Sequence, residues 1–501
     1  MRNPTKRGVP ARRIVLWIII ILAILWISSA VVQTQWIQRF YEGDLRETVS
    51  RLIHKKSNLT PRYPLNHPEQ LLIEWSICLI VAGLAIYRKR KSSAVYLWIK
   101  QYQKTLLLIT FIVGIILRIS WILYANPEAF SDATDYRRLG CKLSSGRTYE
   151  SGGNPSWRPP GYPFLLSLAY RAGLDETLGA RAIDISASMV FPLVLSLIAW
   201  TISGSFAGCI TFVVTYLNPI IICHSGNSLA EVPYSVFLYA GLLFLFLSSR
   251  GSRGWTRNGS LFISGALFGF AALIKPTALA ALFLSMIYQG IDRRCLFRSL
   301  LLLAGALIII SPWSTRNYRV NDAFLMISSN GGEVFYSANK ILQPWKGGDF
   351  NLENYVSLRE REPNPIKRDR LGYRMGIRWM VGHPWITVRS LPYRFLRLFE
   401  NLNYAAHGWW ARTRVPTPWP IISILVASFF LIPILSLIYA RDIMSSLLMN
   451  KELRLLGILF LIYIMIHLLF EGSGRVFFPY FWLVLVLIIC SSAAKSDQHV
   501  D

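Results

Sequence analysis

The sequence predicts an all-α protein that crosses a membrane many times. Hydrophobic residues make up 53% of its 501 residues, whereas charged residues make up only 16%. A soluble protein of this size would carry about 25% charged residues. The apolar residues are gathered in runs, and a run of about 20 residues matches the hydrocarbon core of a bilayer. The polar linkers between runs are strongly basic on one side, which is the bias that orients membrane proteins.

Twelve apolar runs are candidate membrane spans. They cover residues 14–32, 71–87, 105–124, 183–200, 206–222, 231–249, 259–274, 277–291, 300–313, 420–440, 455–470 and 476–493. The shorter runs can span if neighbouring helices and local thinning of the bilayer help them. A cleaved signal peptide is the alternative for the first run, although that run is longer than the apolar part of a usual signal peptide.

The basic linkers predict the orientation of the chain. Lysine and arginine gather on one side of the predicted membrane, in residues 2–13, 88–104, 250–257, 293–298 and 441–454. The positive-inside rule makes this side cytoplasmic, so we expect both termini inside. One linker disagrees with this orientation, because residues 33–70 carry six basic residues on the predicted outer side.

The spans divide the chain into four parts. Residues 1–104 form an N-terminal extension with two spans, and residues 105–313 form a transmembrane core with an outer loop at 125–182. Residues 314–419 form a second outer segment, and residues 420–501 hold the last spans and a cytoplasmic tail. The second outer segment is too long for a simple connector, so we expect it to carry structure of its own.

Net charge and cysteine spacing argue against a nucleic-acid-binding protein and against a protein held together by disulfides or zinc. A net charge of +26 would indicate a nucleic-acid partner in a soluble protein. In a membrane protein, basic residues at the membrane edge match the anionic lipid headgroups instead, so we expect membrane lipids and no nucleic acid as partners. The six cysteines form no Cys-x-x-Cys pair, and no disulfide or zinc framework is predicted.

Two polar motifs follow the third apolar run. The first contains Asp132 and Asp135, whose spacing places both carboxylates on one face of a helix. They lie beside a membrane exit and could act on a lipid-linked substrate, whereas capping of a loop helix is an equal alternative. The second motif is Arg158-Pro159-Pro160, and because its prolines fix the backbone, Arg158 is held in place.

The order of these and later motifs resembles a known family. It is similar to the polyprenyl-phosphate-sugar-dependent glycosyltransferases of the GT-C superfamily, the group of the protein O-mannosyltransferases and the lipid A aminoarabinose transferase. The resemblance covers residues 105–493, whereas residues 1–104 depart from the family's usual start. The motifs that carry it, in order, are Asp132-x-x-Asp135-Tyr136, Arg158-Pro-Pro-Gly-Tyr-Pro, Ala230-Glu231-Val232-Pro233, Gly265-Ala-Leu-Phe-Gly269, Ile274-Lys275-Pro276, Pro312-Trp313-Ser-Thr-Arg316, Ser328-Ser329-Asn330-Gly331-Gly332 and Glu471-Gly-Ser-Gly-Arg475.

The resemblance implies a fold and an activity. The fold would be a GT-C-like bundle of twelve transmembrane helices with a mixed extracytoplasmic segment. The activity would be that of an inverting hexosyl- or pentosyltransferase in the plasma or inner membrane, with its active site on the extracytoplasmic face. Such an enzyme moves a sugar from a polyprenyl-phosphate carrier to a lipid, glycan or protein acceptor. Since phosphate is a stable leaving group, a single base that deprotonates the acceptor suffices.

The resemblance also implies roles for individual residues. Asp132 matches the family's catalytic aspartate, with Asp135 and Glu231 as catalytic neighbours. Asp135 lies beside a pair of arginines, which would lower its basicity, whereas Asp132 has no cation within four positions. The substrate's phosphate requires cations in fixed positions, and the candidates for substrate binding are Arg118, Tyr136, Arg158, Lys275, Arg316 and Arg475.

Alternatives remain open for these residues and for the class of protein. Snorkelling to the interface is an equal alternative for Arg118. Lys275 lies between two apolar spans, where an ionisable group is costly and usually functional. No cofactor is demanded, but a divalent metal held by oxygen ligands and His224 remains an alternative. A lipid flippase or transporter would show broken helices and inverted repeats, and a scaffold protein would have no reason to keep the motifs in this order.

Overall fold

The structure of this protein is a computed structural model, which describes residues 92–129, 131–250, 254–289, 293–344, 351–410, 435–436, 438–472 and 474–497. The chain divides into two compact units, residues 1–76 and 77–501, and every described residue belongs to the second. The predicted spans 14–32 and 71–87 lie outside the described residues, as does most of 420–440.

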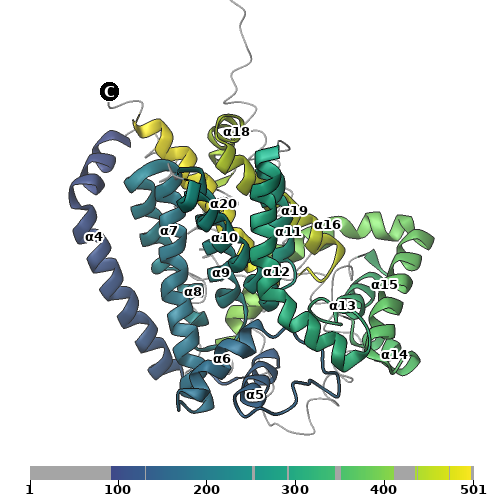
Figure 1. Cartoon of the computed structure of the whole chain (residues 1–501). Helices are drawn as coiled ribbons and strands as arrows, with labels where there is room; N and C mark the ends of the chain where they lie inside the picture. The colour runs from purple at the N-terminus through teal and green to yellow at the C-terminus, as the bar shows by residue number, and fades with distance from the viewer. Residues whose placement is uncertain are drawn as a thin grey trace, which may run out of the picture. The chain divides into compact units, whose positions relative to one another are not determined.

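Regular structure in the described residues is helical, which confirms the predicted all-α class. These residues hold no β-strand, and their one β-bridge joins Ser151 and Asn154. In chain order (Figure 1), the elements are α4 (Ser92–Ser120), η1 (Trp121–Ala125), α5 (Asp132–Ser144), α6 (Gly161–Arg171), α7 (Glu176–Tyr216), α8 (Pro219–Cys223), η2 (His224–Gly226), α9 (Glu231–Arg250), α10 (Gly254–Ile274), α11 (Ala278–Tyr288), α12 (Arg293–Asn321), α13 (Gly331–Asn339), α14 (Leu352–Arg361), α15 (Pro365–Gly382), α16 (Pro384–Trp410), α18 (Ala440–Met449), α19 (Lys451–Leu469) and α20 (Gly474–Asp497).

Seven helices of the described part are long and apolar enough to cross a membrane. The protein is therefore a multi-pass membrane protein, as predicted. α11 is a shorter apolar helix that matches the predicted run 277–291. These helices are Ile99–Leu123, Glu176–Tyr216, Glu231–Arg250, Thr256–Ile274, Leu296–Asn321, Lys451–Leu469 and Val476–Ala493, and the described part does not confirm the predicted number of twelve spans.

The long helix α7 is a hairpin that contains two of the predicted runs. Its backbone leaves helical geometry at Ser203 and at Gly204, where φ is +82°, a value that glycine adopts without strain. The chain then returns along itself, because Ser196 Oγ donates to the carbonyl oxygen of Gly208 at 2.8 Å. Two residues twelve positions apart would be about 18 Å apart in a continuous helix. The predicted runs before and after the bend are therefore antiparallel arms.

Close packing of α10 against α12 explains the glycines of the Gly265-to-Gly269 motif. A Cβ at Gly265 would lie 1.9 Å from the carbonyl oxygen of Leu302, and one at Gly269 would lie 2.8 Å from that of Ala306. Only glycine fits at such distances. Small residues four apart allow backbones to approach closely, as is typical of membrane helices.

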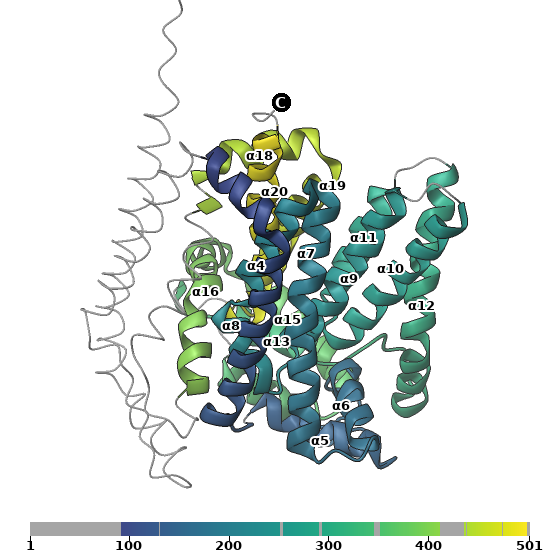
Figure 2. The ribbon, with the colours of Figure 1, turned by 90° about the vertical axis from the view of Figure 1, so that its left-hand side faces the viewer.

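The two predicted outer segments meet at one end of the helical bundle. α5 and α6 lie at its foot and α18 lies at its head (Figures 1 and 2). The loop before α13 joins the loop after α5 there, because the Ser329 amide donates to the carbonyl oxygen of Ser156 at 2.9 Å and Asn154 Nδ2 donates to Ser329 Oγ at 3.0 Å. These hydrogen bonds join the two polar segments at the foot of the bundle.

In its described part, the segment 314–419 folds into helices joined by a buried charge cluster. The side chain of Glu333 on α13 is fully buried, and its two oxygens accept from Arg368 Nε at 2.6 Å and Arg359 Nε at 3.3 Å. The cluster therefore ties α13, α14 and α15 together. Asn364 caps α15 and precedes a proline at the first helical position, which is a common helix start.

Candidate active site

Arg158 lies between the two carboxylates at the start of α5. Its Nη2 donates to Asp132 Oδ1 at 2.6 Å and its Nε donates to Asp135 Oδ2 at 3.1 Å. The Tyr136 ring lies near the guanidinium, with its centroid 5.3 Å from Cζ, within the range of a cation–π contact. The three charged side chains are 17–22% exposed, so a substrate can reach a cluster that is otherwise enclosed.

The local backbone sets the direction of the two carboxylates. Asp132 is the first residue of α5 and Asp135 lies one turn later, so both project from one face, as their spacing predicts. The helix N-terminus also favours negative charge. Ser131 enters the helix with φ +49°, an unusual conformation for a residue other than glycine. Such local strain is often found beside functional side chains.

Asp135 is held by more partners than Arg158 alone. Ser151 Oγ lies 2.8 and 3.0 Å from its two oxygens, and Arg138 Nη2 donates to Oδ1 at 2.6 Å. Burial works against ionisation, but the hydrogen bonds of Arg138 and Ser151 and the charge of Arg158 lower the pKa of Asp135 below its ordinary value. Asp135 is therefore ionised at neutral pH and suited to holding Arg158.

Ser151 is a site residue that sequence reasoning missed. It begins a tight turn with Gly152 and Gly153, whose φ angles are +57° and +75°, and Asn154 closes the turn with backbone hydrogen bonds of 3.0 Å in both directions. Two adjacent glycines between polar residues are a turn signal. This signal, directly before the Arg158 motif, could have placed Ser151 near the carboxylates.

Arg316 supports the loop that carries Arg158. Its Nη1 donates to the carbonyl oxygen of Pro155 at 2.5 Å and its Nη2 donates to that of Tyr149 at 2.8 Å. The Tyr149 hydroxyl in turn lies 3.1 Å from the carbonyl oxygens of Arg158 and Pro159. Arg316 therefore acts on Arg158 through the loop and has fewer donors left for a phosphate than the sequence suggests.

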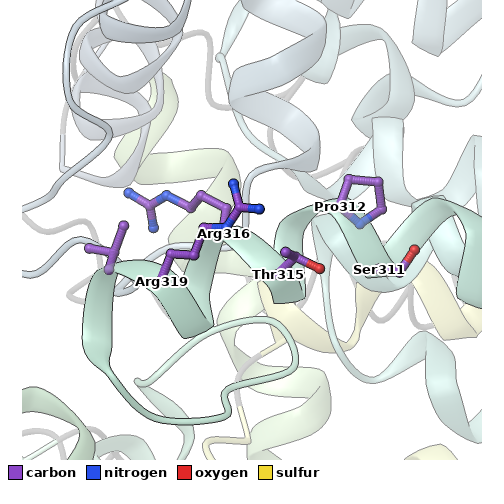
Figure 3. A pocket seen from close by; sticks show the side chains of 6 residues that line it. Ser311, Pro312, Thr315, Arg316 and Arg319 are labelled. Atoms are coloured by element: carbon purple, nitrogen blue, oxygen red, sulfur yellow. The ribbon is translucent and has the colours of Figure 1, made fainter.

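A pocket of about 380 Å³ opens beside Arg316 on α12. Arg316 and Arg319 lie one turn apart on its wall (Figure 3), at the end of the span Leu296–Asn321. The other lining residues are Ser311, Pro312, Thr315 and Val320. Apolar residues of α12 and two cations therefore line the same pocket.

Glu231 and Lys275 form a second ion pair at the ends of α9 and α10. Lys275 Nζ lies 3.0 Å from Glu231 Oε1, and the two side chains are 16% and 4% exposed. The pair adjoins the Arg158 motif, because a Cβ at Gly161 would lie 2.8 Å from the backbone nitrogen of Ile274. Ile274 directly precedes Lys275. The fold therefore places both ion pairs at the same end of the bundle.

One of the predicted substrate-binding residues, Arg118, is not brought into this cluster. Arg118 on α4 is fully buried and donates to both arms of α7, at Ser188 Oγ (2.9 Å), the Ser188 carbonyl (2.9 Å) and the Tyr216 carbonyl (3.1 Å). It holds helices together and does not snorkel to the interface. Arg475 lies in α20, and its side chain is outside the described part.

The divalent metal that the sequence left open would need a group of ligands among the described residues. They contain no group of three or more His, Cys, Asp or Glu side chains that could hold a metal ion. The Arg158 guanidinium lies between Asp132 and Asp135. His224 is buried and stacks on Phe478, with ring centroids 4.8 Å apart.

α14 also reaches the site, which no sequence pattern indicated. The guanidinium of Arg359 lies over the rings of Trp157 and Tyr355, 4.8 and 4.3 Å from their centroids. Trp157 directly precedes Arg158. The charge cluster around Glu333 is thus connected to the active-site loop through Arg359.

The described fold and site define a polytopic helical membrane protein with a carboxylate–arginine cluster at one end of its spans. The sequence matches no protein-family model and no curated protein. Among solved structures, the chain is similar to the archaeal oligosaccharyltransferase AglB from Archaeoglobus fulgidus in complex with an inhibitory peptide and a dolichol-phosphate (14% identity, TM-score 0.45, 80% of this chain and 51% of that chain). It is also similar to the Archaeoglobus fulgidus oligosaccharyltransferase in the apo form (13% identity, TM-score 0.48, 79% of this chain and 51% of that chain).

A second similar protein is ArnT from Cupriavidus metallidurans bound to undecaprenyl phosphate (13% identity, TM-score 0.37, 78% of this chain and 77% of that chain). AglB and ArnT are GT-C superfamily glycosyltransferases. The chain spans about half the length of the oligosaccharyltransferase that it matches.

Proposed function

We propose that the protein is a glycosyltransferase that moves a sugar from a polyprenyl-phosphate carrier to an acceptor hydroxyl. The observation that carries this proposal is the cluster of Asp132, Arg158 and Asp135 at the end of the membrane spans. It combines a partly exposed carboxylate with a cation in fixed geometry. Transfer from a lipid phosphate requires both, one to accept a proton and one to bind the phosphate.

The donor's phosphate would bind Arg158 and Lys275. Arginine and lysine form strong charge-assisted hydrogen bonds with phosphate oxygens. A phosphate at Arg158 replaces Asp132 at Nη2, while Asp135 keeps its bond to Nε because Ser151 and Arg138 hold it. Asp132 then loses an opposite charge, and its basicity rises.

The chemical step needs one proton transfer and one displacement. Asp132 takes the proton of the acceptor hydroxyl, whose oxygen attacks the anomeric carbon of the sugar. The bond between that carbon and the phosphate oxygen breaks, and polyprenyl phosphate leaves as an anion. A single displacement inverts the anomeric carbon. Glu231 fixes Lys275 beside the leaving phosphate, and Arg316 keeps the Arg158 loop in position.

A transfer assay tests the proposed function. Purified full-length protein is mixed with a set of polyprenyl-phosphate sugars and with lipid, glycan and protein acceptors. We expect sugar to appear on one class of acceptor and free polyprenyl phosphate to accumulate in equal amount. A protein that moves the intact lipid between leaflets of a vesicle without sugar transfer would be a flippase, and the proposal would then be wrong.

We also propose that the site faces the extracytoplasmic side, because the basic linkers lie at the other end of the spans. The exposed Thr148, near the site, and Met449, which is 88% exposed at the head of the bundle, provide a matched pair. In a variant without native cysteines, a membrane-impermeant maleimide added to intact cells should label Thr148→Cys and not Met449→Cys. The reverse pattern would contradict the orientation. Native Cys141 is a poor probe, because burial and Glu176 raise its pKa to about 12.

A further inference from the structure

A second polar pocket, of about 740 Å³, lies on the face of α5 that points away from Asp132. At 100° per residue, Arg137 and Cys141 in its wall lie roughly 140° and 180° around the helix from Asp132. Five basic side chains line this pocket, which we call the arginine pocket: Arg137, Arg138, Lys142, Arg147 and Arg181. Its acidic lining residues are Glu128 and Glu176.

Three of these cations have no carboxylate partner among the described residues. Arg138 pairs with Asp135 at 2.6 Å, and Lys142 pairs with Glu150 at 3.3 Å. Arg137, Arg147 and Arg181 form no such ion pair in the described part of the chain. Since five basic and two acidic side chains line the arginine pocket, its lining carries an excess of positive charge.

Two guanidinium groups in the wall also have unused donors. Arg137 is only 9% exposed; its Nε donates to Ser228 Oγ at 2.7 Å, but its Nη2 has no hydrogen-bond acceptor among the described residues. Arg181 donates from Nη2 to Asn126, whereas its Nε is buried and likewise lacks an acceptor in the described part. Buried donors without an acceptor are rare and unfavourable in native proteins. The two guanidinium groups therefore keep hydrogen-bonding capacity that the described residues do not use.

The position of the arginine pocket indicates where the anion comes from. One wall, residues 126–129, directly follows the span Ile99–Leu123, and another, residues 176–181, begins the span Glu176–Tyr216. The lower end of α7 lies beside α5 in both views (Figures 1 and 2). A pocket between the ends of two adjacent spans lies at the level of the lipid headgroups, where cations meet anionic lipids.

We propose that the arginine pocket binds the phosphate of an anionic phospholipid, at a site separate from the one that receives the donor phosphate. Arginine presents a planar set of donors that fits phosphate oxygens, and three such groups without carboxylate partners converge here. The bias that places basic residues in the cytoplasm does not account for them, because this end of the spans is the proposed outer side. The site does not depend on sugar transfer, since it lies on the other face of α5.

The test measures lipid binding to the full-length protein in detergent by native mass spectrometry. Phosphatidylglycerol and phosphatidylcholine with the same acyl chains are titrated in parallel, and a third series uses inorganic phosphate as the soluble source of the same chemistry. We expect phosphatidylglycerol to bind more tightly than either of the others. Each of Arg181→Gln and Arg147→Gln should weaken its binding about 10- to 100-fold, the effect of one lost charge-assisted hydrogen bond.

The matched control is Arg370→Gln, which removes an exposed arginine on α15 and should leave phosphatidylglycerol affinity unchanged. Arg147 is itself exposed, so its variant is expected to fold even if Arg181→Gln does not. Equal binding of the two phospholipids, or wild-type affinity in Arg147→Gln and in every folded Arg181 variant, would overturn the proposal. If inorganic phosphate binds as tightly as phosphatidylglycerol, the ligand is a soluble phosphate and the lipid assignment is wrong.

Discussion

Asp132→Asn should lower the turnover of sugar transfer by about 10²- to 10⁴-fold, the usual effect of losing a general base. The substitution keeps the shape of the side chain and removes its basic oxygen. The apparent affinity for the donor should not fall, because the donor's phosphate no longer has to displace a charged carboxylate from Arg158. Turnover is measured at saturating donor, with the inverted product identified by the configuration of its anomeric carbon.

Asp135→Asn is the comparison that separates the two carboxylates. Asp135 accepts from Arg158, Arg138 and Ser151, so its loss should loosen Arg158 and weaken donor binding more than it slows the chemical step. Both variants must unfold at the wild-type temperature in detergent for the comparison to count. Near-normal turnover of Asp132→Asn in folded protein would exclude Asp132 as the base.

Arg158→Ala should weaken donor affinity by about 10- to 100-fold, since one charge-assisted hydrogen bond to phosphate contributes roughly 1.5–3 kcal/mol. Arg158→Lys keeps the charge but cannot donate from two separate nitrogens in a fixed fork. We therefore expect its affinity to lie between those of Arg158→Ala and the wild type. Donor affinity is measured with a non-transferable polyprenyl-phosphate analogue, so that binding is measured in the absence of turnover.

The control for Arg158 is Arg374→Ala, which removes an exposed arginine on α15 and should bind the donor normally. Lys275→Ala tests the second cation in the same assay. Its effect should be of similar size, because Lys275 lies beside the Arg158 motif and is held by Glu231. Wild-type donor affinity in folded Arg158→Ala and Lys275→Ala would remove the proposed phosphate site.

The membrane spans could be predicted because the bilayer constrains the sequence so strongly. In lipid every backbone polar group must be satisfied within the segment, so a long apolar run can only be a helix. The run 183–200 lies within the first arm of α7, whereas the run 206–222 extends past the end of the second arm at Tyr216 into α8. The same argument places the polar segments at the ends of the spans.

The partners of the site residues could be predicted only in part. The pair of Asp135 and Arg138 was visible as a short-range pattern, since the residues are three apart. The partner of Asp132 was not, because Arg158 lies 26 positions later and reaches it through the turn at Ser151. The prediction that Arg316 binds phosphate also missed partners that are far away in sequence. Only the folded loop reveals that the carbonyl oxygens of Tyr149 and Pro155 accept its hydrogen bonds.

The burial of Arg118 has a consequence for how the protein is assembled in the membrane. An arginine within a spanning helix costs about 2.5–3.5 kcal/mol on insertion when it lies at the centre, and less toward the ends. In the finished fold, the arms of α7 supply its acceptors at Ser188 and Tyr216, but these residues are synthesised long after α4. The newly made α4 therefore carries an arginine without these acceptors until α7 has been inserted, so the two helices become stable in the bilayer together.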